Sequence, residues 1–558
     1  MLGEAQEGYE KGAEQAEGHL TALEGEKGGI PGEGQERESE MTALHDRFLW
    51  AENDRRTAAS LGMPLEEMDR QIDIFRRGVS PAHLSRPCVL GDGIVAISDQ
   101  ERPSLLAAHE EARREGRLMK FVPASGAASR MFRDWHLAMT KGAFPDREEG
   151  KNFIRSLKNY AFYRDLAEAV AARGGSLSGM EEKGEYAKIL GFILTDKGLN
   201  YGNLPKALIK FHRYPEGERT ALQEHLVESA LYVRNQDRIA RVHFTVSAEH
   251  EKAVRDHLLQ IVRSFEALFE TFFAFAVSIQ DPATHTLAVD FEKMPFRDEN
   301  GMLLFRPAGH GALIENLNSL DADIVYVKNI DNIAVDRHKD DTVIWKKLLA
   351  GYLAVVQKEI FGHLLTLEHP EPAEELIAGV VEFCRRRLNL APPLSFGASS
   401  LEEKRRFLFE ALNRPLRVCG MVKNEGEPGG GPFWVQNLCR SDAVSLQIVE
   451  ESQVDMNKPE QKAIWSSSTY FNPVDLVCGL LDYRGRKFNL TDFVDHETSI
   501  IVKKSEKGRD ILALEKPGLW NGSMALWNTI FIEVPSTTFN PVKTVKDLLR
   551  PYHQNDGV

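Results

Sequence analysis

The stretch PASGAASR at 123–130 contains residues that could bind phosphate, and it follows an apolar run that predicts a buried strand. The small residues Ala124, Ser125 and Gly126 would let phosphate oxygens approach backbone N–H groups at the start of a helix. Arg130 could hold the same oxygens with two parallel hydrogen bonds. A tight turn between a strand and a helix is the alternative explanation for these small residues.

Two charged residues occupy comparable places further along the chain. Lys206 follows Pro205 and precedes the apolar run ALIKF, so we expect it at the start of a strand as a fixed cation. Asp331 follows the apolar run DIVYV, and a carboxylate at the end of a strand could hold Mg²⁺ against phosphates. The alternatives are an exposed lysine after a proline turn and an aspartate in a turn beside Asn332.

His310 lies between Gly309 and Gly311 in the stretch RPAGHG. Flanking glycines would allow a ring of a ligand to lie against the backbone, because no Cβ atom is in the way. A turn at the start of a helix is the alternative here. The polar tips around His310 and Asp331 both lie beside a predicted buried strand, which makes this region a hypothetical ligand site.

The elements that must position these residues alternate between strands and helices. Short runs of nearly continuous β-branched or aromatic residues predict strands covered on both faces, at 118–122, 241–247, 272–279 and 323–327. Helical patterns lie between them. This alternation predicts an α/β fold with a doubly wound, mostly parallel central sheet, in which ligands bind beyond the carboxyl ends of the strands.

Composition and turn residues divide the chain into five predicted parts. They are an acidic tail expected to be disordered (1–42), an N-terminal helical segment (43–116), an α/β core (117–340) with a helical insertion (144–200), a helical subdomain (341–412) and an α+β C-terminal part (413–558). The first 40 residues contain eleven Glu against three basic residues, so this tail carries 3 − 11 = −8 of the charge and cannot bury much apolar surface.

Composition limits the class of protein. With 558 residues, 42% of them hydrophobic, the chain is long enough for a large core, and its formal charge of −14 argues against binding nucleic acid. It has no basic segment followed by an apolar run at its start and no stretch of 18 apolar residues, so we expect a cytoplasmic protein without membrane spans. Five cysteines without a Cys-x-x-Cys pair favour reduced thiols over disulfides or a zinc site.

The order of these motifs resembles that of the UDP-sugar pyrophosphorylases, which are nucleotidyltransferases of the GT-A type. The similar segments are PASGAASRM, LPKALIKF, RPAGHGALIENL, YVKNIDNIAVD, LQIVEESQVD, YFNPVDLVCGL and VPSTTFNPVKTVKDLL, in that order over about residues 117–549. The resemblance implies that the chain joins a nucleoside triphosphate, UTP by preference, to a sugar 1-phosphate and releases pyrophosphate.

The resemblance also implies a role for individual residues. Arg130 and Lys206 would hold the triphosphate, Asp331 the Mg²⁺ cofactor and Lys543 the sugar phosphate, and Lys503 or Lys504 would lie near the phosphates. The nucleotide would be bound by His310, Gly309 and Gln280, together with the loop at 124–126. The sugar hydroxyls would be bound by Glu450 and Asn472. The α/β core would then bind the nucleotide and the C-terminal part the sugar phosphate. His310 is expected to be a fixed donor, because an ionised phosphate needs no proton removal before it attacks.

The whole chain also resembles a bacterial domain-of-unknown-function family, number 4301, which shares the opening loop and the closing FNPVKTVKDLLRP. Two other functions stay open. The same fold serves glycosyltransferases that consume nucleotide sugars, and the glycine-poor first loop would also suit a nucleotide or sugar-phosphate binder without turnover. Pyrophosphate, free nucleoside diphosphate or no product distinguishes the three functions. The oligomeric state is not predicted.

Overall fold

The structure, a computed structural model, describes residues 49–126, 128–369, 373–426, 429–437 and 440–555. The predicted acidic tail at 1–42 lies outside the described residues, as does Cys439. The described residues from Asn53 onward form one compact unit. The other four cysteines are buried free thiols, as the sequence predicts.

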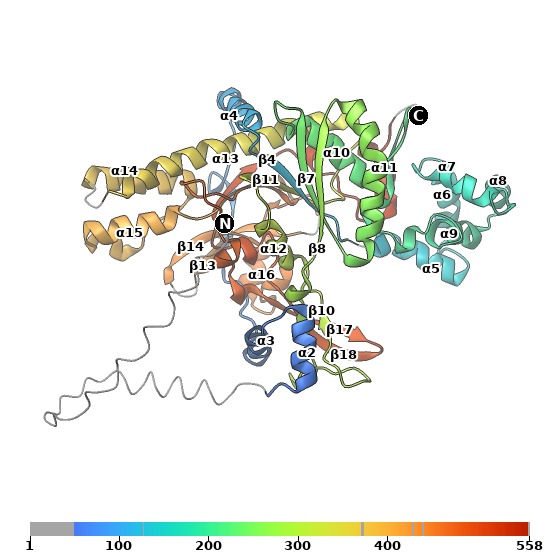
Figure 1. Ribbon diagram of the computed structural model, residues 1–558, viewed down its shortest axis with the longest axis horizontal. Helices are drawn as coiled ribbons and strands as arrows, with labels where there is room; N and C mark the ends of the chain where they lie inside the picture. Colours follow the sequence, from blue (N-terminus) through green and yellow to red (C-terminus); the bar gives the residue numbers. More distant parts are fainter. Residues whose placement is uncertain (1–48, 127, 370–372, 427–428, 438–439, 556–558) are drawn as a thin grey trace, which may run out of the picture. The chain divides into compact units, whose positions relative to one another are not determined.

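The centre of this unit is a 10-stranded sheet (Figure 1). Its path of hydrogen-bonded strands is β2 (Val89–Leu90), β3 (Gly93–Val95), β19 (Asn528–Glu533), β12 (Leu416–Lys423), β16 (Asp475–Gly479), β11 (Ile324–Lys328), β4 (Leu118–Pro123), β7 (Ile239–Val246) and β8 (Phe272–Ile279). Neighbours on this path are parallel except at β16, which is antiparallel to β12 and β11. The short β15 (Tyr470–Phe471) pairs with β12 beside the path. The predicted α/β fold with a mostly parallel central sheet is confirmed.

Helices cover both faces of the sheet. One face packs against α4 (Arg102–Arg114), α10 (Ala221–Tyr232), α11 (Glu251–Phe269) and α13 (Lys339–Leu367). The other packs against α12 (Leu313–Asn318) and parts of the C-terminal chain. Alternate residues of β11 divide between the two cores, which explains why this strand reads as continuously apolar.

One helix among the described residues is apolar and long enough to cross a membrane by length and composition alone. It is α13, in the range Asp336–Leu367, in which one stretch of 18 residues has a mean hydropathy of 1.2. Of this stretch 61% is buried inside the molecule, and the helix packs against β12 and β16. Figure 1 shows it lying across the sheet, as the core helix of a globular domain does.

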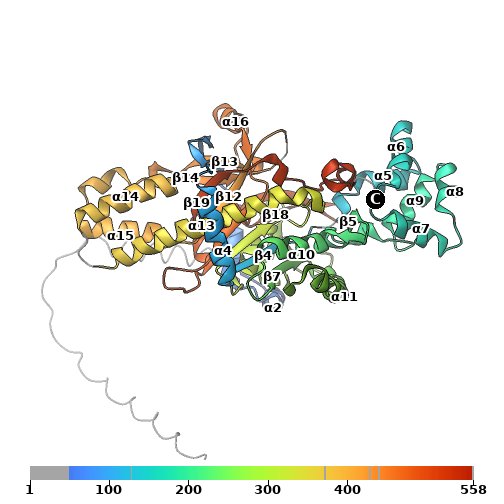
Figure 2. The same cartoon turned by 90° about the horizontal axis from the view of Figure 1, so that it is seen from above.

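The remaining elements form smaller groups around this core. The other helices are α2 (Glu52–Leu61), α3 (Leu65–Arg77), α5 (Arg133–Lys141), α6 (Arg147–Leu157), α7 (Tyr163–Ala171), α8 (Leu177–Glu182), α9 (Tyr186–Leu194), α14 (Glu374–Leu388), α15 (Leu401–Leu412) and α16 (Pro459–Ser466). Small sheets are formed by β5 (Lys210–Tyr214) with β6 (Gly217–Thr220), by β1 (Leu84–Pro87) with β13 (Gly431–Asn437) and β14 (Arg440–Val449), and by β9 (Thr286–Val289), β10 (Phe305–Arg306), β17 (Ile500–Glu506) and β18 (Arg509–Glu515). In Figures 1 and 2, α5–α9 lie at one end of the sheet and α14 and α15 at the other.

The predicted boundaries at 340 and 413 do not separate compact units. β12, β16 and β19 come from the predicted C-terminal part, yet they belong to the same sheet as β4 and β11. The first boundary falls inside α13. The segment 43–116 is not purely helical, because β2 and β3 extend the central sheet through β19. Local composition changes at these points, but the long-range pairing of strands joins the parts.

The strand predicted to begin at Lys206 is also wrong in detail. The structure has a short 3₁₀ turn at Lys206–Leu208, and β5 begins only at Lys210. Pro205 precedes the turn with φ −72° and lacks an N–H group, and the N–H of Ile209 donates to the Lys206 carbonyl at 3.1 Å. The apolar run after Lys206 therefore begins as a turn that packs into the core.

Candidate active site

Three segments with candidate residues leave the central sheet at the same edge. β4, β11 and β19 run in the same direction, so the chain that follows each strand starts from their shared carboxyl edge. The first segment leads to Arg130, the second to Asp331 and the third to Lys543. This is the edge at which open α/β sheets bind ligands.

Asp331 binds two lysines at this edge. Lys206 Nζ donates to Asp331 Oδ2 at 2.7 Å and to the backbone carbonyl of Val542 at 2.7 Å. Lys543 Nζ donates to the same Asp331 oxygen at 3.4 Å. Lys206 and Asp331 are buried, whereas the Lys543 side chain is 51% exposed. One carboxylate thus gathers two ammonium groups from distant segments, and one of them faces solvent.

Burial and charge act against each other in this cluster. Burial raises the pKa of Asp331, but the ammonium groups of Lys206 and Lys543 outweigh it, and the net pKa lies below the ordinary value of an aspartate. Burial lowers the pKa of Lys206, and the charges of Lys543 and Arg130 lower it further, while Asp331 raises it. Asp331 is therefore a carboxylate, and the cluster with Arg130 has three positive groups and one negative group.

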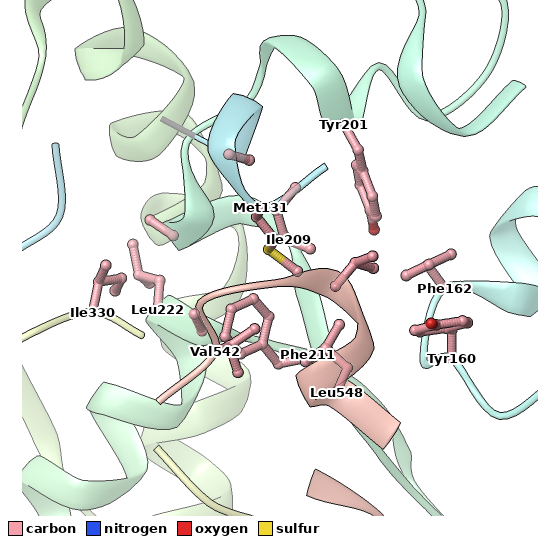
Figure 3. Close-up of a cluster of buried hydrophobic side chains, with 14 of the residues drawn as sticks. Met131, Tyr160, Phe162, Tyr201, Ile209, Phe211, Leu222, Ile330, Val542 and Leu548 are labelled. Carbon is pink, nitrogen blue, oxygen red and sulfur yellow. The ribbon is translucent and has the colours of Figure 1, made fainter. Parts of the chain in front are cut away.

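Apolar packing next to each charged residue holds the cluster in place. Arg130, Asp331 and Lys543 each have a sequence neighbour buried in one apolar cluster (Figure 3). These neighbours are Met131, Ile330 and Val542. Backbone hydrogen bonds join the same segments, from Val542 to the Asp331 carbonyl at 3.0 Å and from Val545 to the Met131 carbonyl at 3.1 Å. The charged side chains therefore project from a packed base rather than from free loops.

The loop after β4 lies beside Lys206. The N–H of Lys206 donates to the Gly126 carbonyl at 3.2 Å. Ala124 is buried at the base of the loop, while Ser125 and Gly126 are exposed. Apart from the residues on either side of Gly126, no heavy atom of the described residues lies within 4 Å of the point where a Gly126 Cβ would be. Arg130 is exposed, and no carboxylate within the described residues forms an ion pair with it. The loop is thus open on one side, with an unpaired guanidinium nearby.

The expected Mg²⁺ site can be tested against Asp331. Its Oδ1 atom is buried and has no hydrogen-bond partner in the described part of the chain. Over the same residues, no group of three or more His, Cys, Asp and Glu side chains gathers as a metal site. Mg²⁺ usually takes one or two carboxylates, with phosphate oxygens and water as its other ligands. A single orphaned carboxylate oxygen therefore fits an ion that arrives with a phosphorylated ligand.

His310 belongs to a different set of contacts. Its ring stacks on Trp520 with centroids 4.1 Å apart and planes at 15°. Its Nδ1 accepts the N–H of Leu519 at 3.0 Å, so the proton of the neutral ring is on Nε2, which lies 3.8 Å from Glu450 Oε1. Burial lowers the pKa of His310, although Glu450 and Glu515 raise it. The ring is thus a neutral donor that faces Glu450.

The glycines beside His310 serve the packing of the chain on itself. Gly309 has φ 77°, which glycine adopts without strain, and a Cβ on Gly311 would lie 2.1 Å from the carbonyl oxygen of Pro517. The N–H of Lys516 donates to the Ala308 carbonyl at 3.0 Å. Gly311 thus allows the segment after β18 to pack closely against the backbone at Gly311. The sequence had instead led us to expect a ligand ring against these glycines.

Glu450 also lines a cavity of about 1180 Å³. The stacked rings of Phe433 and Trp465, with centroids 5.3 Å apart, form part of its wall. Aromatic faces and carboxylate oxygens are groups that contact sugars, so Glu450 lies in a suitable place for its expected role.

Gln280 follows β8, where its Nε2 donates to Thr284 Oγ1 at 3.3 Å.

The side-chain amide of Asn472 forms hydrogen bonds to backbone groups. Its Nδ2 donates to the Gly420 carbonyl at 3.0 Å, and its Oδ1 accepts the N–H of Val474 at 3.0 Å. Val474 has φ 59°, a conformation that β-branched residues rarely adopt. The amide of Asn472 therefore holds a strained turn, and both of its polar groups already have protein partners.

The structure distinguishes Lys503 from Lys504, which the sequence does not. Both are exposed on β17. Lys503 Nζ lies 5.2 Å from the ring centroid of Phe291, whereas Lys504 Nζ lies 3.1 Å from Glu515 Oε1. Glu515 is also the side chain nearest to the Cβ position of Gly309. Lys504, and not Lys503, is therefore on the side of the strand that faces the segment of Gly309.

Sequence reasoning missed several residues that complete the site. The Val542 carbonyl is the second acceptor of Lys206, and Asn332 Oδ1 accepts the N–H of Asn540 at 2.8 Å. Trp520 covers one face of His310. No local sequence pattern marks a backbone acceptor or a stacking partner. The one available signal was that Val542 precedes Lys543, that Asn332 follows Asp331 and that Trp520 lies in the segment after β18.

Solved structures similar to this chain include two sugar-nucleotide pyrophosphorylases. The uridine diphosphate N-acetylglucosamine pyrophosphorylase from Trypanosoma brucei matches with a TM-score of 0.42 and 12% identity, over 93% of this chain and 82% of that chain. The UDP-glucose pyrophosphorylase from Leishmania major matches with a TM-score of 0.38 and 10% identity, over 90% of this chain and 78% of that chain. At such low similarity neither reaction nor substrate transfers to this chain.

None of the curated proteins compared with the chain matches it. A family model does match, and it spans residues 51–554, which include every candidate residue named above. The chain therefore belongs to the family described as domain of unknown function (DUF4301).

Proposed function

We propose that this protein is a nucleotidyltransferase that joins a nucleoside triphosphate to a sugar 1-phosphate and releases pyrophosphate. The observation that carries the proposal is the meeting of Lys206, Lys543 and Asp331 at the carboxyl edge of the sheet, within electrostatic reach of Arg130. Three positive groups against one carboxylate leave an excess of positive charge, which suits the convergence of a triphosphate and a sugar phosphate. The order of motifs along the chain supports the same reaction.

The reaction asks mainly for position and charge. A sugar phosphate oxygen attacks the α-phosphorus in line, so two anionic ligands must be held together and the leaving pyrophosphate must be stabilised. Lys206 has three N–H donors, of which Asp331 and Val542 take two, so one remains for a phosphate oxygen. Its burial fixes it in one place, as catalysis by preorganised charge requires.

Lys543 and Arg130 would bind opposite partners of the reaction. The Lys543 side chain is half exposed, and among the described residues its Nζ bonds only to Asp331, so it can turn toward an entering sugar phosphate. Arg130 stands at the open loop after β4, where it would hold triphosphate oxygens with its planar fork of donors. Asp331 Oδ1 would hold Mg²⁺, which when bound would neutralise phosphate charge.

The base and the sugar would be recognised on either side of these phosphates. The neutral Nε2–H of His310 and the nearby Gly309 and Gln280 are the proposed nucleotide contacts, with UTP as the favoured triphosphate. Glu450, on the wall of the large cavity, would accept hydrogen bonds from sugar hydroxyls. His310 and Glu450 approach each other, so the two subsites would adjoin.

A thermal-shift screen against nucleoside triphosphates and sugar phosphates with Mg²⁺ tests the proposal. A ligand present at a hundred times its dissociation constant should add roughly 2.7 kcal/mol to the free energy of unfolding. We expect stabilisation by UTP and by at least one sugar 1-phosphate, and a loss of both shifts in Lys206→Met. The matched control is Lys507→Ala, which removes an exposed lysine in the turn between β17 and β18. Stabilisation by neither ligand class would contradict the proposal.

A further inference from the structure

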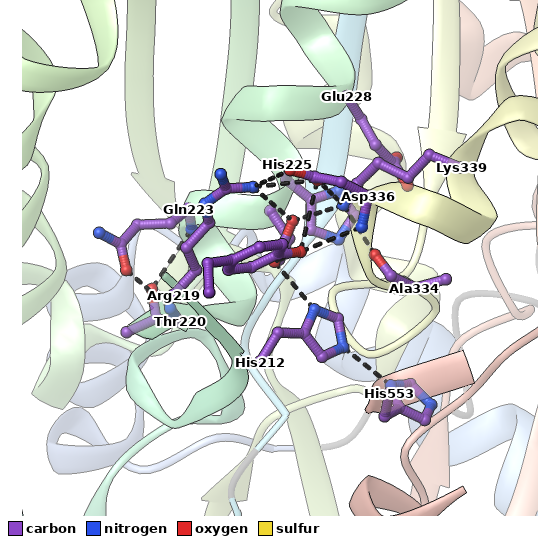
Figure 4. A network of polar contacts seen from close by, with 12 residues as sticks. His212, Arg219, Thr220, Gln223, His225, Glu228, Ala334, Asp336, Lys339 and His553 are labelled. Atoms are coloured by element: carbon purple, nitrogen blue, oxygen red, sulfur yellow. Dashed lines mark hydrogen bonds and ion pairs between the residues drawn. The ribbon is translucent and has the colours of Figure 1, made fainter. Parts of the chain in front are cut away.

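A buried carboxylate outside the candidate site, Glu224, contacts segments that carry the site residues. Glu224 lies on α10 and is fully buried. Its Oε2 accepts from Lys339 Nζ at 2.6 Å, and its Oε1 accepts from His212 Nδ1 at 2.8 Å and from the Tyr214 hydroxyl at 2.7 Å. His212 and Tyr214 are on β5, which begins just after Lys206. Figure 4 shows this network around His212 and Lys339.

Lys339 extends the network to the loop that carries Asp331. Its Nζ also donates to the Ala334 carbonyl at 2.7 Å and to Asp336 Oδ1 at 2.8 Å. Both acceptors lie in the short connection between Asp331 and α13. Glu224 therefore fixes this connection through one buried ammonium group.

His212 extends the network to the C-terminal segment. Its Nε2 lies 2.9 Å from His553 Nδ1, and the two rings are stacked with centroids 5.2 Å apart. A carboxylate only accepts, so His212 Nδ1 donates to Glu224, and Nε2 of the neutral ring accepts from His553 Nδ1. Burial lowers the pKa of both imidazoles, that of His553 well below its ordinary value. The two rings therefore connect the C-terminal segment to Glu224.

The segment that ends at His553 is the one that carries Lys543. It returns to the Asp331 loop a second time, since the N–H of Val335 donates to the Tyr552 carbonyl at 3.0 Å. The Tyr552 ring also lies 4.7 Å from that of His338. The network thus reaches the segments that carry Lys206, Asp331 and Lys543.

We propose that Glu224, His212 and His553 are positioning residues, which act as a C-terminal latch that sets Lys543 against Lys206 and Asp331. None of the three touches the charged cluster itself, and the latch acts through the segments that it joins. Stability alone does not explain such a network, because a buried charge pair is often no better than a packed apolar core. A geometric requirement at the adjoining site does explain it. The inference rests on the proposed function for the role of Lys543.

The test compares two substitutions of His553 in the full chain. His553→Phe removes the N–H that faces His212, whereas Asn in His553→Asn has an amide N–H at about the place of Nδ1. The probe is inorganic phosphate with Mg²⁺, titrated by calorimetry, because the phosphate of the sugar is the group that Lys543 is proposed to hold. We expect His553→Phe to raise the Kd about tenfold and His553→Asn to restore most of that loss. His363→Phe, which changes a partly exposed histidine on α13 outside the network, is the matched control and should leave the Kd unchanged.

A double-mutant cycle separates positioning from general destabilisation. In a Lys543→Ala background, the latch has no lysine left to place, so His553→Phe should cause no further rise in Kd. Additive losses, or a lowered Tm with an unchanged Kd, would overturn the latch. If His553→Phe does not fold, His553→Ala takes its place in the comparison with His553→Asn.

A crystal structure of the variant keeps the inference separate from the proposed function. We expect Lys543 Nζ and Asp331 Oδ2, 3.4 Å apart in the native chain, to separate beyond ion-pair distance in His553→Phe. If inorganic phosphate binds to no form of the protein, the proposed role of Lys543 in holding phosphate fails, and this distance alone decides the latch. An unchanged distance would overturn it.

Discussion

Lys206 Nζ lies 2.7 Å from Asp331 Oδ2, although 125 residues separate the two in the chain. Both side chains are buried, and Asp331 also receives Lys543 at 3.4 Å. A buried ion pair often contributes little net stability to the fold, because the cost of desolvating the two charges offsets most of their attraction. The unsatisfied Oδ1 of Asp331 and the spare donors of the lysines are consistent with a site prepared for a charged ligand.

Removing the carboxylate of Asp331 should lower the stability of the fold. Asp331→Asn leaves Lys206 buried without its counter-charge, so we expect a loss of about 3 kcal/mol in the free energy of unfolding by urea. Lys206→Met in addition should recover part of this loss, because the uncompensated charge is then absent. The control is Asp256→Asn, which breaks the exposed pair with Lys252 and should change little. Simple addition of the two single losses would argue against a coupled pair.

Lys543 and Arg130 should differ in the ligand that depends on them. Lys543→Ala should weaken the binding of a sugar 1-phosphate more than that of UTP, and Arg130→Ala should do the reverse, each by about tenfold or more for the ligand that it contacts. Calorimetric titration of both ligands with both variants gives four constants. Equal losses for both ligands would mean that the two cations share one phosphate.

The two neighbouring lysines of β17 should be separable by nucleotide binding. Lys504 pairs with Glu515 beside Gly309, whereas Lys503 lies over Phe291. We expect Lys504→Ala to change the Kd for UTP by a few fold and Lys503→Ala to leave it unaltered, although both remove one exposed charge. An effect confined to Lys503→Ala would place the nucleotide on the other face of the strand.

Two buried histidines should make the protein sensitive to mild acid. Burial lowers the pKa of His109 to about 4 and that of His243 to about 4, whereas the unfolded chain binds these protons near pH 6.5. The unfolded state therefore holds more protons between these values, so stability falls as the pH falls, by about 1.6 kcal/mol for each ring between about pH 6.5 and pH 5. Urea unfolding at both pH values should show a smaller pH dependence in His109→Gln. An unchanged dependence would show that other groups cause the acid sensitivity.

The local sequence was enough to predict individual strands of the central sheet but not how distant strands pair. β4, β7, β8 and β11 lie within a residue or two of the predicted strands, because each reads as an apolar run. β11 is buried on both faces as predicted, but β8 lies at the edge of the sheet and exposes Phe272, Ala274 and Ala276, so the prediction that it is covered on both faces is wrong. The antiparallel β16 and the pairing of β19 with β12 were not predicted, since they join segments far apart in the chain.

The same limit applies to the site. The motif order indicated Arg130, Lys206, Asp331 and Lys543, and the structure brings them to one edge of the sheet. It did not indicate that Lys206 begins a 3₁₀ turn or that backbone groups already bind the amide of Asn472. The buried network of Glu224 left no local signal, because charged residues on a helix are usually solvent-exposed.

The most direct test of the account identifies the products formed from UTP, a panel of sugar 1-phosphates and Mg²⁺. The account predicts that the purified protein releases pyrophosphate and forms a nucleotide sugar with at least one member of the panel. It also predicts that Lys206→Met abolishes this release, while Lys507→Ala does not change it. Release of free nucleoside diphosphate from nucleotide sugars, or binding of these ligands without any product, would contradict the account and favour a glycosyltransferase or a binding protein.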